Sequence, residues 1–206
     1  QGDTVLFNQG AVATIKACLL LGLLSTIGLS FAGPAVLIIL YGHDFSAGAQ
    51  IICWLALMQG IRTAKAGPTI IAISCGQTKL PLIANVVRSL GVGFVLISIW
   101  LGWGIFGVVV GGIIGEILAV IVFLELCRRR IGLNLGLVYK SFLVSIVMVT
   151  GSIVLTTNYI DGSAPLIEIG SSLIVGLFAI VVFLIVAPDL IKWFRSTEKK
   201  QTDISA

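Results

Sequence analysis

Charged residues are scarce in this chain: they make up only 11% of its 206 residues, whereas hydrophobic residues make up 58%. A soluble domain is typically about 25% charged and about 45–50% apolar. The scarcity of charge and the mean hydropathy of +1.13 therefore exclude an ordinary soluble domain and indicate an integral membrane protein. The formal net charge of +4 is too small to indicate a surface for nucleic acid.

Residues that hold metals or carry out catalysis are equally sparse. The only histidine, His43, has no second His or Cys at a spacing typical of a metal site or of a Ser/His pair. The four cysteines lie in or beside apolar runs without a CxxC spacing, so we interpret them as small apolar residues without a disulfide framework. A GxxxxGK(S/T) phosphate loop is also absent. The sequence therefore predicts no metal, no cofactor and no enzymatic activity.

Long apolar runs are what the sequence has instead, and crossing a bilayer takes about 20 mostly apolar residues. Six segments qualify, covering roughly residues 12–31, 49–74, 81–101, 105–127, 140–157 and 165–187. The predicted fold class is an all-α polytopic membrane protein with six transmembrane helices and a polar tail over residues 188–206. The chain begins with Gln1 rather than Met, and we expect that further sequence precedes it.

The cations between these segments alternate with loops that lack them. Lys79 follows the second segment, Arg128, Arg129 and Arg130 follow the fourth, and the tail after the sixth is rich in Lys and Arg. The loops "YGHDFSAG", "WLGWG" and "NYIDGSAP" hold neither. Because cytoplasmic loops carry the excess of Lys and Arg, both termini and the polar tail are predicted to be cytoplasmic.

The fourth segment carries Gly107, Gly111 and Gly115, a row of small residues at four-residue spacing. Such a row lets two membrane helices approach closely, so we predict a tight helix–helix contact here. The alternative is a gliding surface for a conformational change.

The second segment carries two cations, Arg62 and Lys65, deep in its apolar run. Arg62 lies about twelve residues from the outer end, which is about 18 Å at 1.5 Å per residue. Each cation costs about 2.5–3.5 kcal/mol at a helix centre, so both are expected to face protein or a wet cavity rather than lipid. Helical spacing places Gln59, Arg62, Lys65 or Ala66, and Thr69 on one polar stripe.

Neighbouring segments add Asn85, Arg88 and Glu116. Arg62, Lys65 and Arg88 contribute +3 and Glu116 contributes −1, which leaves +2 that pairing alone does not neutralise. We therefore predict a cationic cavity for an anionic ligand, with Arg62, Lys65, Arg88, Gln59 and Asn85 as candidate binding residues. Glu116 is the candidate acidic partner or titrating group. The alternatives are a purely structural bridge to Glu116, and a re-entrant break at "TAKAGP".

Two stretches resemble a known family. "LIILYGHDFSAGAQIICWLALMQGI" is similar to the region between the seventh and eighth helices of polysaccharide (O-antigen-type) flippases, through Leu40, Tyr41, Gly42, Phe45 and Ala47. These flippases belong to the multidrug/oligosaccharidyl-lipid/polysaccharide exporter superfamily. The stretch from "SCGQTKLPLIANVVRSLG" onward is similar to the next hairpin of that family. The resemblance covers most of residues 12–130, and the residues that carry it in this second stretch are Gly76, Lys79, Asn85, Gly104 and Gly107.

The resemblance implies that the chain is the C-terminal six-helix lobe of a two-lobe exporter in a bacterial inner membrane, with the N-terminal lobe missing. The implied substrate is a polyprenyl-pyrophosphate-linked oligosaccharide, flipped by alternating access for surface polysaccharide or lipopolysaccharide synthesis. Arg62, Lys65 and Arg88 would then hold the pyrophosphate, and the implied partners are this substrate, membrane lipid and the other lobe.

Three other functions remain open. A multidrug/cation antiporter of the same superfamily would be expected to have an acidic cavity, whereas the embedded charge here is net positive. A membrane-embedded polysaccharide ligase or polymerase would be expected to have long outward loops, and those here are short. A structural membrane subunit would use the embedded cations only as bridges.

Overall fold

The computed structural model describes residues 2–133, 136, 138–159 and 165–188, and this part of the chain is helical without strands. The polar tail predicted at 188–206 lies outside it except for its first residue. The elements are α1 (Gly2–Tyr41), the short 3-10 helix η1 (His43–Gly48), α2 (Ala49–Ser74), α3 (Lys79–Ser89), α4 (Gly91–Trp100), α5 (Gly104–Ile131), α6 (Tyr139–Tyr159) and α7 (Pro165–Val186).

Three helical stretches are long and apolar enough to cross a membrane: Phe7–Tyr41, Lys79–Trp100 and Gly104–Ile131. They identify the chain as a helical, membrane-embedded protein, because a membrane core admits a backbone only when its polar groups are bonded internally. The second stretch joins α3 and α4, which meet at Leu90. Shorter apolar helices lie at Tyr139–Ile153 and Leu173–Val186. The count of six spans stays a prediction.

The helix α2 runs without interruption from Ala49 to Ser74 and contains Pro68. The alternative of a re-entrant break at "TAKAGP" is therefore wrong. Apolar surroundings favour a continuous helix here, since an open loop would leave backbone groups without partners inside the membrane. Arg62 and Lys65 consequently lie on a regular helix, and their spacing places them on one face of it.

Glycine turns close the two tight connections of the middle hairpin. After α2, Gln77 N–H donates to Ala72 O at 2.8 Å and Gly76 N–H donates to Ile73 O at 2.9 Å. After α4, Trp103 N–H donates to Ser98 O and Gly102 N–H donates to Ile99 O in the same way, each at 3.0 Å. Gly76 and Gly102 have φ of 71° and 76°, the left-handed conformation that this type of helix end requires. The turn at Gly76 reverses the chain between α2 and α3, and the turn at Gly102 reverses it between α4 and α5.

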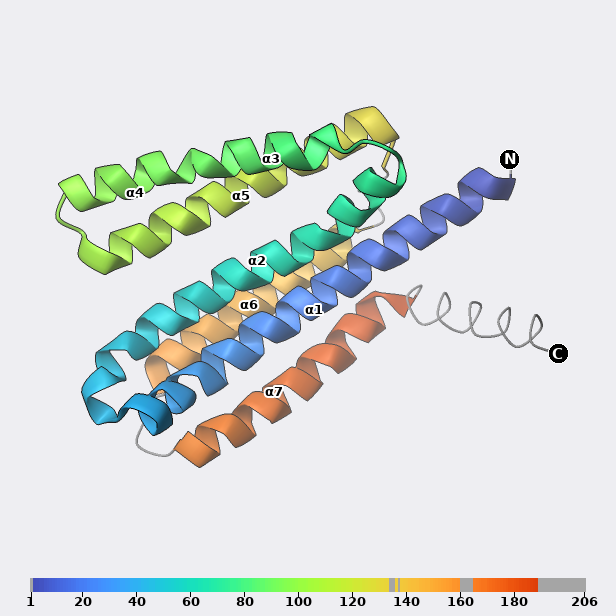
Figure 1. Cartoon of the computed structure of the whole chain (residues 1–206). Coiled ribbons are helices and arrows are strands. Elements are labelled where there is room, and N and C mark those ends of the chain that lie inside the picture. The colour runs from blue at the N-terminus through green and yellow to red at the C-terminus, as the bar shows by residue number, and fades with distance from the viewer. Residues whose placement is uncertain (1, 134–135, 137, 160–164, 189–206) are drawn as a thin grey trace.

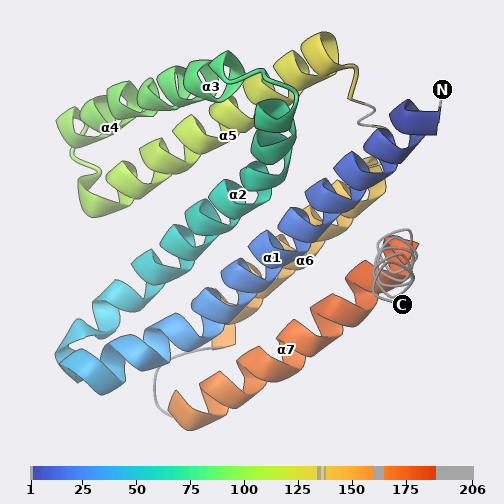
Figure 2. The ribbon, with the colours of Figure 1, turned by 45° about the vertical axis from the view of Figure 1, so that its right-hand side comes forward.

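Apart from α3 and α4, which follow one another in the same direction, successive helices run in opposite directions (Figure 1). α3, α4 and α5 form a hairpin beside α1, α2, α6 and α7 (Figures 1 and 2). One buried apolar cluster joins the two groups. It includes Leu23 and Ile27 of α1, Phe123 of α5 and Phe183 of α7, each at most 2% exposed. This cluster packs the end of α5 onto the other helices, and α2 contacts α5 further along, where the Trp54 ring meets that of Phe106.

The glycine row of α5 packs tightly against α3 and α4. A Cβ added to Gly107 would lie 2.6 Å from Ser98 Cβ, and one added to Gly111 would lie 2.8 Å from Val95 N. One added to Gly115 would lie 2.9 Å from both Arg88 O and Gly91 Cα. The predicted tight contact is confirmed, because real Cβ atoms essentially never approach other atoms this closely. The gliding role stays a prediction.

The cations outside the helix interiors gather at one end of the molecule. In the described part of the chain these are Lys79, Arg128–Arg130 and Lys140, at the start of α3, the end of α5 and the start of α6. These helix ends lie on the side where the chain begins (Figure 1). The opposite end carries Trp100 and Trp103. This polarity agrees with the alternation of cationic and cation-free loops in the sequence.

Candidate functional site

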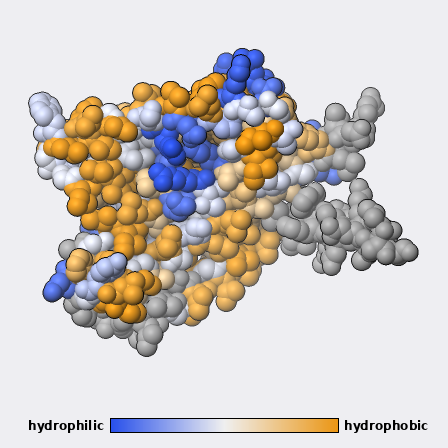
Figure 3. Space-filling model, viewed as in Figure 1, coloured by the Kyte–Doolittle hydropathy of each residue, from blue (hydrophilic) through white to orange (hydrophobic). Residues whose placement is uncertain are grey.

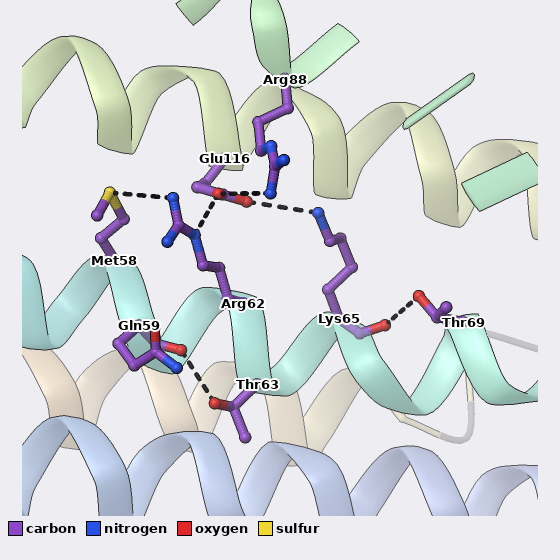
Figure 4. A network of polar contacts seen from close by, with 8 residues as sticks. All are labelled: Met58, Gln59, Arg62, Thr63, Lys65, Thr69, Arg88 and Glu116. Carbon is purple, nitrogen blue, oxygen red and sulfur yellow. Dashed lines mark hydrogen bonds and ion pairs between the residues drawn. The ribbon is translucent and has the colours of Figure 1, made fainter. Parts of the chain in front are cut away.

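Three helices bring polar side chains together about halfway along the molecule. Arg62 and Lys65 come from α2, Arg88 from α3 and Glu116 from α5, and the three cations converge on the Glu116 carboxylate (Figure 4). The close approach at Gly115 brings the backbone of Arg88 next to the residue that precedes Glu116. The glycine row therefore positions the site as well as the hairpin.

Glu116 binds all three cations with its two oxygens. Arg62 Nε donates to Glu116 Oε1 at 2.5 Å, and Lys65 Nζ donates to Oε2 at 3.4 Å. Arg88 Nη1 lies 3.6 Å from Oε1, which is an ion pair. Arg62 Nη2 also contacts the sulfur of Met58 at 3.8 Å. The bridge that we considered as the structural alternative is therefore present, and Arg88 belongs to it as well.

The four side chains differ strongly in exposure. The Glu116 side chain is 1% exposed and that of Lys65 is 12% exposed, whereas those of Arg62 and Arg88 are each 43% exposed. The carboxylate thus lies at the bottom of the cluster, and the two guanidinium groups form its accessible side. Because three cations share one anion, the cluster keeps a formal charge of +2.

A cavity of about 250 Å³ opens beside the guanidinium groups. Its lining residues are Arg62, Lys65, Thr69, Pro81, Ala84, Asn85 and Arg88. Figure 3 shows hydrophilic surface in the middle of this face, surrounded by apolar surface. The arrangement offers guanidinium, ammonium and amide donors to one small polar group, which is the donor set that recognises phosphate and carboxylate.

Four of the five candidate binding residues line this cavity, and Gln59 does not. Gln59 is exposed, its carbonyl oxygen accepts a hydrogen bond from Thr63 Oγ1 at 3.0 Å, and Figure 4 shows it apart from the carboxylate. The cavity is also lined by three residues that are not candidate binding residues: Thr69, Pro81 and Ala84. The sequence pattern could have predicted Thr69 as a lining residue, because it lies four residues beyond Lys65 on the polar stripe. No sequence pattern indicates Pro81.

One further embedded cation was missed. Lys16 lies on α1 and is only 3% exposed, and it does not line the cavity. Its signal was a cation inside an apolar run, the same signal that singled out Arg62 and Lys65.

Metal ligands do not cluster in this region. In the described ranges, no group of three His, Cys, Asp or Glu residues could hold a metal ion. The four cysteines are free thiols.

Comparison of the chain with protein-family models, with curated proteins and with solved structures gave no match.

Proposed function

We propose that the chain is one six-helix lobe of an exporter that flips a polyprenyl-pyrophosphate-linked oligosaccharide across a bacterial inner membrane. The observation that carries the proposal is the accessible cation pair of the cavity. Arg62 and Arg88 turn their guanidinium groups toward a cavity, while the only carboxylate among them lies beneath. A structural bridge alone would need one cation for one carboxylate.

The charge of the cluster suits a diphosphate diester. The formal charge of +2 is the opposite of the two negative charges that such a linkage carries. Desolvating fixed cations without a counterion is costly inside a membrane, so a site with this excess favours an anionic ligand. Arg62 and Arg88 can each donate two parallel hydrogen bonds to phosphate oxygens.

The surface around the cavity suits a ligand with an apolar tail. The wall on the α3–α4 side continues into exposed Val92 and Leu96, and α2 exposes Leu55. Figure 3 shows that apolar surface of this kind borders the hydrophilic area. An amphiphile can therefore place its charged linkage in the cavity while its chain stays in an apolar environment.

The size of the cavity limits what it binds. Sites for drug-sized ligands measure about 300–1,000 Å³. A cavity of about 250 Å³ holds a diphosphate but not an oligosaccharide. In this proposal the sugar occupies the space between this lobe and a second lobe, and the two lobes rock around the central site.

The positions of the charges support an orientation. The end that carries Lys79, Arg128–Arg130 and Lys140 faces the cytoplasm in this proposal, because cytoplasmic ends carry the cation excess. All six predicted segments then cross the membrane and both termini are cytoplasmic. The net positive cavity disfavours a cation antiporter of the same superfamily.

A purely structural role for the cluster is the second candidate, and the contacts of Glu116 favour it. Breaking a buried ion pair by removing one partner costs about 3–5 kcal/mol, so the bridge alone would stabilise the contact of α2 and α3 with α5. In that case the cations would affect stability but not the binding of any anion.

Binding measurements on the purified protein in detergent test the proposal. The ligand is a sugar linked through diphosphate to a farnesyl chain, and the matched ligand is the same sugar linked to farnesol without phosphate. We expect binding of the diphosphate only, and a loss of about tenfold or more in Arg62→Gln and Arg88→Gln, the equivalent of about 1.4 kcal/mol for a charged hydrogen bond. Arg130→Gln, an exposed cation outside the cavity, is the control.

Two results would reject the proposal. One is equal affinity of the wild-type protein for both ligands. The other is unchanged diphosphate binding in Arg62→Gln and Arg88→Gln, which together with a lower melting temperature would establish the structural bridge.

A further inference from the structure

Glu116 has a place in the site that the binding role of the cations does not explain. Its side chain is 1% exposed and absent from the cavity wall, yet both of its oxygens are engaged with cations that form that wall. A ligand in the cavity would therefore meet the cations and not the carboxylate. Glu116 acts on a ligand through its charge and through the cations it holds.

The action through charge can be counted directly. With Glu116 the cluster has +2, and without it the same three cations would give +3. We infer that Glu116 is a specificity-determining residue that sets the cavity to the charge of a dianion and thereby keeps the anion releasable. This inference rests on the proposed function, because it concerns the same cavity.

The physical basis is the range of electrostatic forces in a poorly solvated site. A buried carboxylate a few ångströms behind the cations opposes every negative charge that enters, and this repulsion is weakly screened away from water. Its removal strengthens the binding of a dianion more than that of a monoanion, because each ligand charge meets one more unit of positive potential. A transporter loses turnover when its ligand binds too tightly, since the ligand must leave on the other side.

The two least exposed members of the cluster offer a matched double variant. Lys65 and Glu116 are paired through Oε2, and neutralising both leaves Arg62 and Arg88 with the original +2. The variant Lys65→Gln/Glu116→Gln therefore keeps the charge of the site while it removes the carboxylate. The variant Glu116→Asp does the opposite, because it keeps the charge and shortens the side chain.

The experiment measures the affinity of the purified protein in detergent for diethyl diphosphate, a dianion, and for dimethyl phosphate, a monoanion. In Glu116→Gln we expect the affinity for diethyl diphosphate to rise about tenfold or more, and the affinity for dimethyl phosphate to rise by a smaller factor. In Lys65→Gln/Glu116→Gln and in Glu116→Asp we expect affinities within about threefold of the wild-type protein. Lys65→Gln alone leaves the cluster with a charge of +1, so this variant should bind diethyl diphosphate more weakly than Lys65→Gln/Glu116→Gln and Glu116→Asp do.

A Glu116→Gln protein that folds but binds diethyl diphosphate no more tightly than the wild type overturns the inference. If Glu116→Gln does not fold, the double variant decides: near-wild-type affinity supports the inference, and affinity as low as that of Lys65→Gln overturns it. Failure of the proposed function is distinguishable, because the wild-type protein would then bind neither anion, or would bind both equally with and without Arg62.

Discussion

Gly91 of α4 and Gly115 of α5 lie so close that a Cβ added to Gly91 would stand 2.9 Å from the Cα of Gly115. The same glycine, Gly115, approaches the carbonyl oxygen of Arg88 and precedes Glu116 in the chain. The backbone contact of the hairpin and the ion cluster are therefore one structural unit. A change in the spacing of these helices moves Arg88 relative to the carboxylate.

Gly115→Ala is expected to destabilise the protein by about 1–3 kcal/mol, because the new methyl group has backbone atoms on two sides and no flexible side chain to displace. The melting temperature in detergent measures the effect. Gly93→Ala on α4 is the matched control. Its Cβ meets nothing within 4 Å, so the higher helix propensity of alanine should raise the free energy of unfolding by up to about 1 kcal/mol. Equal melting temperatures for the two variants would show that the contact is not tight.

Gly60→Ala tests the contact between α1 and α2 in the same way. Its Cβ would overlap Thr26 Oγ1 and lie 2.8 Å from Gly22 O, whereas the Cβ of Gly28→Ala on α1 meets nothing within 4 Å. We expect Gly60→Ala to lower the free energy of unfolding by about 1–3 kcal/mol and Gly28→Ala not to lower it, as measured by thermal unfolding. A Gly60→Ala protein as stable as Gly28→Ala would mean that α1 and α2 separate easily.

Trp54 stabilises the contact of α2 with α5 through its ring and not through its N–H. The ring meets Phe106 edge-on at a centroid distance of 5.9 Å, while Nε1 is buried without a hydrogen-bond partner within the described chain. Trp54→Phe is therefore expected to stay within about 1 kcal/mol of the wild type in thermal unfolding, and Trp54→Ala to lose about 3–5 kcal/mol. Equal losses in both variants would show that Nε1 has a partner that matters.

Cysteine labelling in whole cells tests the orientation. Trp100, which is 85% exposed, and Arg130, also exposed, lie at opposite ends of the helices. In a chain whose own cysteines are replaced by alanine, a membrane-impermeant maleimide should label Trp100→Cys in intact cells and Arg130→Cys only after lysis. The reverse pattern would invert the proposed topology, and labelling of both in intact cells would contradict it altogether.

The helical character of the chain and the composition of the site followed from local patterns. Apolar runs of membrane length locate the helices to within a few residues at most ends, since hydropathy and the need for internal hydrogen bonds act locally. α1 is an exception, because it continues through Pro34 to Tyr41 as one helix. The convergence of Arg62, Lys65, Arg88 and Glu116 was predictable because embedded charges avoid lipid.

The details of the site depend on packing that no local pattern contains. That three cations share one carboxylate depends on how α3 is rotated against α5, which the contact at Gly115 fixes. Gln59 fits the spacing of the stripe yet lies outside the cavity, because helical spacing covers a wider arc than the cavity does. The burial of Lys16 depends likewise on which face of α1 the neighbouring helices cover.

The small size of the cavity has a consequence for variation among strains. In the proposed function, the cavity of about 250 Å³ holds the charged linkage and has no contact with the glycan beyond it. In the proposed function, a cell can alter the composition of its surface sugar by mutation elsewhere while Arg62, Arg88 and Glu116 stay unchanged. Chains that carry different glycans should then share this ion cluster and diverge in the surfaces that surround it.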